Sequence, residues 1–161
     1  MGKVRTRRKV GYSNFLMSEH PRILGLDVGD RRIGVAISDP QGTTAGGLET
    51  IHRTTMEEDV ATIADVVKRH HVIEIVIGLP LISDGSHDEH AQKAHALGKK
   101  LARATGIPVI YDDERLSTIS AIRTLTVQGA NAGHKRDLVD RQAAAIILQK
   151  HLDRRTPPPT A

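Results

Sequence analysis

The stretch that decides the fold is Ile23-Leu24-Gly25-Leu26-Asp27-Val28-Gly29, followed at once by Asp30-Arg31-Arg32-Ile33-Gly34-Val35-Ala36-Ile37-Ser38-Asp39. The first run is short, apolar and flanked by glycine, which is typical of a buried β-strand. The second run alternates apolar and polar residues well enough to be the neighbouring strand, and the residues between the two have the composition of a tight turn. The sequence therefore predicts a β-hairpin at the start of the fold.

One carboxylate, that of Asp27, interrupts the first of these strands. An ionised carboxylate in a protein core is unfavourable unless it is paired with a cation or binds a metal. Asp27 therefore needs partners elsewhere in the chain.

The bulk composition limits the classes of function. The 161 residues are enough for one domain with a sizeable core, and the absence of cysteine excludes disulfides, thiolate catalysis and cysteine-ligated zinc. No apolar run approaches the roughly 20 residues that span a bilayer, and the basic first residues lack the apolar segment of a secretory signal. We therefore expect a cytoplasmic protein that does not bind membranes.

The charge of the chain favours polyanionic partners, with nucleic acid first among them. The net charge is +4, although a basic protein without such a partner is an equally good interpretation of charge alone. Only 2% of the residues are aromatic, too few for a base-stacking platform. Binding to nucleic acid should therefore rest on phosphate contacts and shape.

The rest of the chain alternates strands and helices. The spacing of apolar residues and the positions of glycine and proline predict strands over 43–52, 72–77 and 109–111. They also predict helices over 56–70, over 88–105, from about Ser117, and over 137–152. The residues 128–135 are predicted to form a loop. We expect an α/β domain over 22–153, between a flexible basic tail (1–21) and a disordered tail (154–161). Its mixed five-stranded sheet would have three antiparallel strands, then β-α alternation, with helices on both faces.

Two further acids stand where they could join Asp27. Glu114 lies just beyond the predicted strand at 109–111, and strand ends of this kind form sites in α/β sheets. Asp140 shares the apolar stripe of the last helix with Ala143, Ala144, Ile147 and Leu148. An all-carboxylate site suits Mg²⁺ or Mn²⁺ and could hold two ions around a phosphodiester. Alternatively, such an acid caps a helix or pairs with Arg115 or Arg141.

Four motifs in order resemble the YqgF family of pre-16S rRNA nucleases, also called Holliday-junction-resolvase-like. They are Leu24-Gly25-Leu26-Asp27-Val28-Gly29 with Ile33-Gly34-Val35-Ala36, Ile77-Gly78-Leu79-Pro80-Leu81 with Asp84-Gly85, Asp113-Glu114-Arg115-Leu116-Ser117-Thr118, and Val139-Asp140 with Ala143-Ala144 and Ile146-Ile147-Leu148. The resemblance covers roughly 22–152 and implies an RNase H-like fold.

The resemblance also implies that Asp27, Glu114 and Asp140 are the catalytic, metal-binding acids. Asp137 is a rival to Asp140, three residues away on the same predicted helix. The spacing from Asp140 to Ala143 favours Asp140, whereas Asp137 fits better as an acid at the start of the helix.

Five residues are candidates for binding substrate. Arg115 could hold the scissile phosphate or orient Glu114, and the hydroxyls of Ser117 and Thr118 could bind backbone phosphate near a helix N-terminus. Gly78 would let the substrate backbone approach closely. Arg31, in the hairpin turn, is assigned to the same group. The structural alternatives are helix capping, a surface ion pair and a plain strand end.

The leading functional prediction is a metal-dependent nuclease that processes the 5′ end of pre-16S rRNA in ribosome biogenesis. The first alternative is a Holliday junction resolvase for branched DNA, which would require a symmetric homodimer to cut two strands. The second is a non-catalytic nucleic-acid-binding assembly factor, although carboxylates near phosphate argue against it. A phosphotransferase related to actin-like ATPases would need two such domains, and the chain has length for one.

Overall fold

The computed structural model describes residues 21–80, 89–114 and 132–155. The strands are β1 (Arg22–Val28), β2 (Arg32–Ser38), β3 (Ala45–His52), β4 (Val72–Pro80) and β5 (Val109–Glu114), and the helices are α2 (Met56–Arg69), α3 (Glu89–Thr105) and α5 (Ala132–Arg155). The helix predicted from about Ser117 and the parts of both tails at 1–20 and 156–161 lie outside the described residues.

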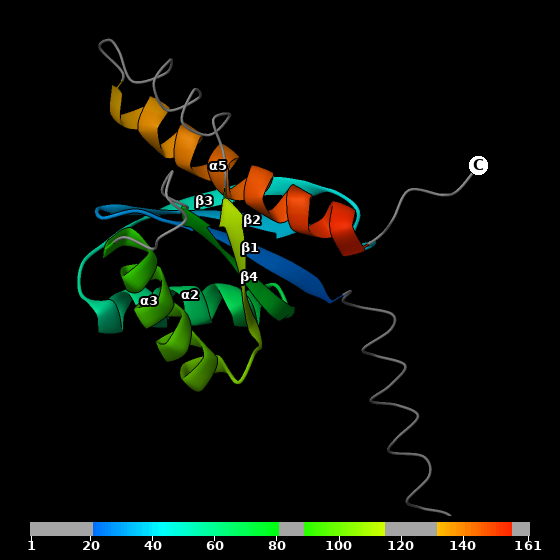
Figure 1. Cartoon of the computed structure of the whole chain (residues 1–161), viewed down its shortest axis with the longest axis horizontal. Helices are drawn as coiled ribbons and strands as arrows, with labels where there is room; N and C mark the ends of the chain where they lie inside the picture. Colours follow the sequence, from blue (N-terminus) through cyan, green and yellow to red (C-terminus); the bar gives the residue numbers. More distant parts are fainter. Residues whose placement is uncertain (1–20, 81–88, 115–131, 156–161) are drawn as a thin grey trace, which may run out of the picture.

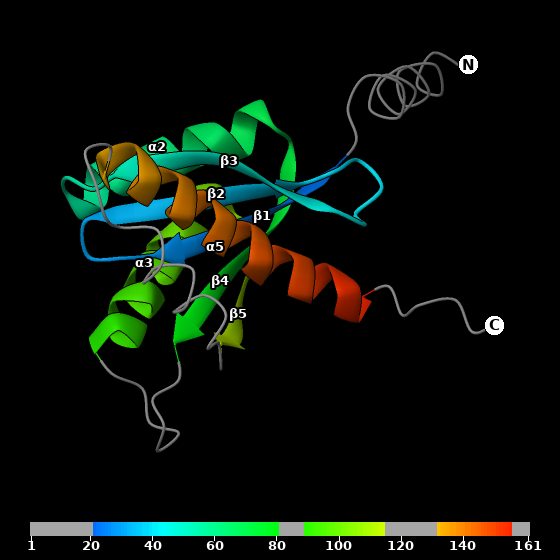
Figure 2. The same ribbon diagram turned by 90° about the horizontal axis from the view of Figure 1, so that it is seen from above.

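The strands form one mixed sheet in the order β3-β2-β1-β4-β5. The first three strands are antiparallel neighbours, whereas β4 pairs with β1, and β5 with β4, in parallel. Helices α2 and α3 cover one face and α5 covers the other (Figure 1; Figure 2 shows α5 crossing the sheet). The predicted hairpin, mixed sheet and two helical layers are confirmed.

The alternation of β1 sends its side chains into two separate cores. Leu24 and Leu26 belong to the core beneath α2 and α3, whereas Ile23 belongs to the core beneath α5. Gly25 also faces α5, because a Cβ added there would lie 2.7 Å from the Cβ of Leu148. Since side chains alternate along a strand, Asp27 faces α5 as well.

The ends of several elements differ from the prediction. The last helix begins at Ala132 and not at Asp137, so the predicted loop over 128–135 is wrong for its last four residues. The same helix continues to Arg155, so Arg154 and Arg155 are helical and do not belong to the predicted disordered tail. Among the described residues, no helix combines the length and apolar character needed to cross a membrane.

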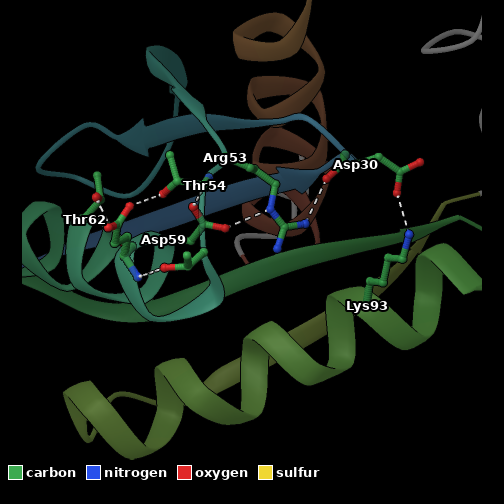
Figure 3. Close-up of polar contacts among 9 residues, drawn as sticks. Asp30, Arg53, Thr54, Asp59, Thr62 and Lys93 are labelled. Carbon is green, nitrogen blue, oxygen red and sulfur yellow. Dashed lines mark hydrogen bonds and ion pairs between the residues drawn. The ribbon is translucent and has the colours of Figure 1, made fainter.

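A buried ion pair connects the start of α2 to the β1–β2 turn (Figure 3). Arg53 donates to Asp59 at 2.9 Å and to the carbonyl oxygen of Gly29 at 3.0 Å. The Asp59 side chain is only 2% exposed, and its second oxygen accepts the Thr54 N–H at 3.1 Å. Asp59 therefore has its charge and both of its oxygens compensated, as a buried carboxylate requires.

We expect Asp59→Asn to lower the free energy of unfolding by about 2 kcal/mol, because the neutral amide weakens hydrogen bonds to a buried guanidinium. Urea unfolding measures this change. The matched control is Asp65→Asn, which removes an exposed pair with Arg69 on the same helix and should cost about 0.5 kcal/mol or less. Equal losses in the two variants would contradict a structural role for the buried pair.

The β2–β3 loop is organised by Asp39, which accepts two backbone and two hydroxyl hydrogen bonds from Thr43 and Thr44. Desolvation raises the pKa of the Asp39 carboxyl, but these hydrogen bonds outweigh it and hold the pKa well below its usual value. The stabilisation is thus present above the unfolded-state pKa and is lost as the pH falls toward the lowered value.

We expect Asp39→Asn to reduce the loss of stability on acidification. The difference from the wild type should appear between pH about 5 and about 2, where the unfolded-state carboxyl takes up a proton before the folded-state carboxyl does. Urea unfolding at a series of pH values measures it. Parallel stability curves for the two proteins would contradict the lowered pKa.

Candidate active site

The centre of the candidate site is Asp27, near the end of β1. Its exposed fraction is 8%, and it pairs across the hairpin with Gly34 of β2. A Cβ added to Gly34 would lie 1.9 Å from the carbonyl oxygen of Asp140. The backbone of α5 therefore rests directly on the residue opposite Asp27, and the structure brings the neighbourhoods of Asp27 and Asp140 together.

The cationic partner of Asp140 is Arg32. The Nε of Arg32 donates to Oδ2 of Asp140 at 2.6 Å, with 26% and 14% of the two side chains exposed. The sequence had offered Arg115 or Arg141 for such a role; Arg115 lies outside the described residues, and the ion pair is made by Arg32. This pair fixes the orientation of the Asp140 carboxylate and leaves Oδ1 without a hydrogen bond among the described residues.

Glu114 and Gly78 lie toward the carboxyl ends of neighbouring parallel strands. Glu114 is the last residue of β5 and pairs with Pro80 of β4, and Gly78 pairs with Asp112. Leu26 pairs with Ile77, so the next residues along these parallel strands are Asp27 and Gly78. Because parallel strands end at a common edge, β1, β4 and β5 bring Asp27, Gly78 and Glu114 to the same end of the sheet.

The other substrate-binding candidates divide into two groups. Arg115, Ser117 and Thr118 lie outside the described residues, so their predicted roles stay predictions. Arg31 lies in the β1–β2 turn and lines a surface pocket beside the site. The structure thus places Arg31 close to the end of the strand that carries Asp27.

One buried acid, Asp112, was missed by the sequence analysis. Its exposed fraction is 6%, and its Oδ1 accepts a hydrogen bond from Arg154 of α5 at 2.7 Å. Its Oδ2 is buried and has no partner among the described residues. Because Gly78 pairs with it, Asp112 adds a carboxylate to the row that starts at Asp27. Extending the predicted strand by one residue beyond Tyr111 would have revealed it.

Asp137 does not start a helix, contrary to the sequence-based interpretation. It lies in the second turn of α5, and the first turn contains no acid. A carboxylate oxygen of Asp137 lies 3.3 Å from Nε2 of His52, and its carbonyl oxygen accepts a hydrogen bond from Thr50 at 2.6 Å. Asp137 therefore ties α5 to β3.

The donor set fits a hard divalent cation. Asp27 and Asp140 offer carboxylate oxygens on the side of the sheet that α5 covers, and oxygen ligands are those that Mg²⁺ and Mn²⁺ prefer. The described side chains alone form no cluster of three ligating groups. The third acid predicted from the sequence is Glu114, whose side chain lies outside the described part of the structure.

Comparison with known proteins identifies the family. Residues 21–154 match the family model of RuvX, described as Holliday junction resolvase. The chain belongs to the RuvX family. A RuvX-type relative from Myxococcus xanthus is 42% identical over 139 residues, which cover 86% of this chain and 92% of the relative. One from Gloeobacter violaceus is 47% identical over 131 residues, covering 81% and 83%. Both are named pre-16S rRNA nucleases, and the resemblance predicted from the motifs is confirmed.

Solved structures show the same fold for this RuvX-family chain. Thermus thermophilus RuvC in complex with a Holliday junction substrate aligns with a TM-score of 0.52 at 17% identity, over 84% of this chain and 96% of RuvC. A second structure of Thermus thermophilus RuvC gives 0.51 at 16% identity, over 83% and 95%. The predicted RNase H-like fold is confirmed. Membership of the RuvX family and the names of the relatives identify the chain as a nuclease.

Proposed function

We propose that this protein is a divalent-metal-dependent nuclease that processes the 5′ end of pre-16S rRNA in the cytoplasm. The observation that carries the proposal is the seating of Asp140 on Gly34, opposite the buried Asp27. This arrangement brings carboxylates together where they are largely buried. Buried carboxylates are unfavourable unless they are paired or bind a cation. The names of the Myxococcus xanthus and Gloeobacter violaceus relatives support the choice of RNA substrate.

The proposed roles follow from the position of each residue. Asp27, Glu114 and Asp140 would hold Mg²⁺ or Mn²⁺, which when bound activates water and stabilises the leaving oxygen of a phosphodiester. Arg32 is a positioning residue, because its hydrogen bond fixes the Asp140 carboxylate. Gly78 lies in β4, between β1 and β5, and would let the substrate backbone approach closely because it carries no side chain. Arg115, Ser117 and Thr118 would contact substrate phosphate next to Glu114.

A Holliday junction resolvase is the second candidate function. The description of the RuvX family favours it. The same acids would then cut a DNA phosphodiester, and two copies of the chain would have to associate symmetrically to cut both strands.

Cleavage assays on two labelled substrates test the proposal. Purified protein is incubated with a precursor rRNA leader or a four-way DNA junction, each with Mg²⁺, with Mn²⁺ or with excess chelator. We expect cleavage of the RNA at defined positions only when metal is present. Cleavage of the junction alone would replace the proposal with the resolvase function. Binding of RNA without cleavage in any metal would favour the assembly-factor interpretation.

A further inference from the structure

A pocket of about 590 Å³ opens beside the end of β1, on the side away from Asp140. The residues that line it include Asp30 and Arg31 of the β1–β2 turn, Arg53, and Lys93 of α3. Figure 3 shows the side chains of Asp30, Arg53 and Lys93. We call it the turn pocket. It begins three residues after Asp27, so it continues the sheet edge that carries the candidate site.

Arg53 and Arg31 of the turn pocket have N–H groups that make no hydrogen bond with the described residues. A guanidinium has five N–H groups, and the Asp59 and Gly29 bonds of Arg53 use two of them. The side chain of Arg31 is exposed and makes no hydrogen bond or ion pair with the described residues. The pocket therefore offers one fixed guanidinium and one that is able to move onto a ligand.

Lys93 is held only weakly. Its Nζ lies 2.9 Å from Oδ1 of Asp30, but about half of each side chain is exposed (53% and 52%). The hydrogen bond from Lys93 lowers the pKa of the Asp30 carboxyl. Exposed pairs of this kind stabilise little, so Lys93 is able to turn from Asp30 toward a stronger anion.

The charges of the turn pocket favour an anion. Arg31, Arg53 and Lys93 face the carboxylates of Asp30 and Asp59. Asp59 already accepts from Arg53 and from a backbone N–H, so among the described carboxylates that line the pocket an incoming anion must displace only Asp30. An arginine side chain can bind two oxygens of a phosphate through a pair of N–H groups. Arg31 is therefore suited to bind a phosphate.

The rim of the pocket reaches the other face of the sheet through His52. This residue lines the pocket and also contacts Asp137 of α5. It pairs across the sheet with Arg32, which holds Asp140. A substrate strand that runs from the candidate site along this end of the sheet would therefore meet the turn pocket at His52.

We propose that the turn pocket binds a backbone phosphate of the RNA substrate, next along the strand from the phosphate that is cut. Arg31 and Lys93 make the contact, and Arg53 fixes the turn that carries Arg31. This inference rests on the proposed nuclease function and adds to it the path of the substrate.

Binding of the labelled rRNA leader in chelator, where no cut occurs, tests the contact. We expect the Arg31→Gln, Lys93→Gln double variant to bind about 10-fold more weakly than the wild type, and the salt dependence to fall by about 0.7 in log–log slope for each lost phosphate contact. The matched control is Lys68→Gln, which removes one exposed charge at the far end of α2. It should change the affinity little.

A second measurement locates the contact on the RNA. Single phosphates around the cut are replaced one at a time by neutral methylphosphonates. One linkage should weaken binding to the wild type but cause no further loss with Arg31→Gln. If the wild type binds and cuts RNA while Arg31→Gln and Lys93→Gln behave like Lys68→Gln, the turn pocket is excluded and the nuclease function stands. If the wild type neither binds nor cuts RNA, both proposals fail together.

Discussion

Asp27→Asn should abolish phosphodiester cleavage, with a rate loss of about 1,000-fold or more, because the neutral amide is a much poorer ligand for a divalent cation. The substitution is nearly isosteric, and Asp27 is only 8% exposed, so the packing around it should be kept.

Two measurements on the same preparations check this result. Initial cleavage rates give the loss of activity, and thermal unfolding with and without Mn²⁺ shows whether the metal still stabilises the fold. Asp65→Asn, which changes an exposed acid of α2, should keep both the activity and the shift with metal. Cleavage by Asp27→Asn at the wild-type rate would show that the chemistry is elsewhere.

Gly34→Ala should both destabilise the protein and impair cleavage. The added methyl group would lie 1.9 Å from the Asp140 carbonyl oxygen and 2.4 Å from its carbon, and both are backbone atoms that no side-chain rotation can move. Helix α5 must therefore shift away from β2. We expect a loss of about 3 kcal/mol in the free energy of unfolding, at the upper end for an overpacked core.

The same shift would carry Asp140 away from Asp27. A displacement of about 1 Å at a catalytic group costs about 100-fold in rate, so cleavage should fall by at least that factor. Gly46→Ala on β3 is the matched control, because its added methyl group meets nothing within 4 Å. Urea unfolding and cleavage rates are compared for the two variants, and similar behaviour would contradict the close contact between α5 and Gly34.

The sequence was sufficient for the parts of the fold that local patterns specify. The apolar runs of β1 and β2 predicted the hairpin, and the apolar stripe of the last helix predicted that Asp140 faces the sheet. The apolar run around Asp27 also predicted that this acid lies in a buried strand. Each of these conclusions needed only residues that are close together in the chain.

The ends of β4 and β5 depend on pairing between strands, and the start of α5 runs against the local helix propensity. Gly133 lowers helix propensity and favoured a loop, but the helix continues through it to Ala132. Strands β4 and β5 run past their apolar segments because Gly78 pairs with Asp112 and Pro80 with Glu114. Neither partner is visible in a local window of sequence, which is also why Asp112 was missed.

The ion pairs of the site were beyond prediction for the same reason. Arg32 and Asp140 are separated by 108 positions, and nothing in either segment identifies the other as its partner. The arginines that the sequence analysis considered as partners, Arg115 and Arg141, did not include Arg32. The catalytic and binding roles of all the predicted site residues stay predictions: Asp27, Glu114, Asp140, Gly78, Arg31, Arg115, Ser117 and Thr118.

Two glycines beneath α5, Gly25 and Gly34, set how closely the helix approaches the sheet. The distance between Asp27 and Asp140 therefore does not depend on which apolar side chains fill the core. At Gly25 and Gly34 the helix meets the strands with backbone or Cβ atoms, which act as mechanical stops. Side chains such as Ile147 and Leu152 fill the remaining space and contribute stability. Substitutions in that layer should therefore change how firmly the helix is held without changing where it stops. The apolar layer is thus free to drift in evolution while the distance from Asp27 to Asp140 is preserved.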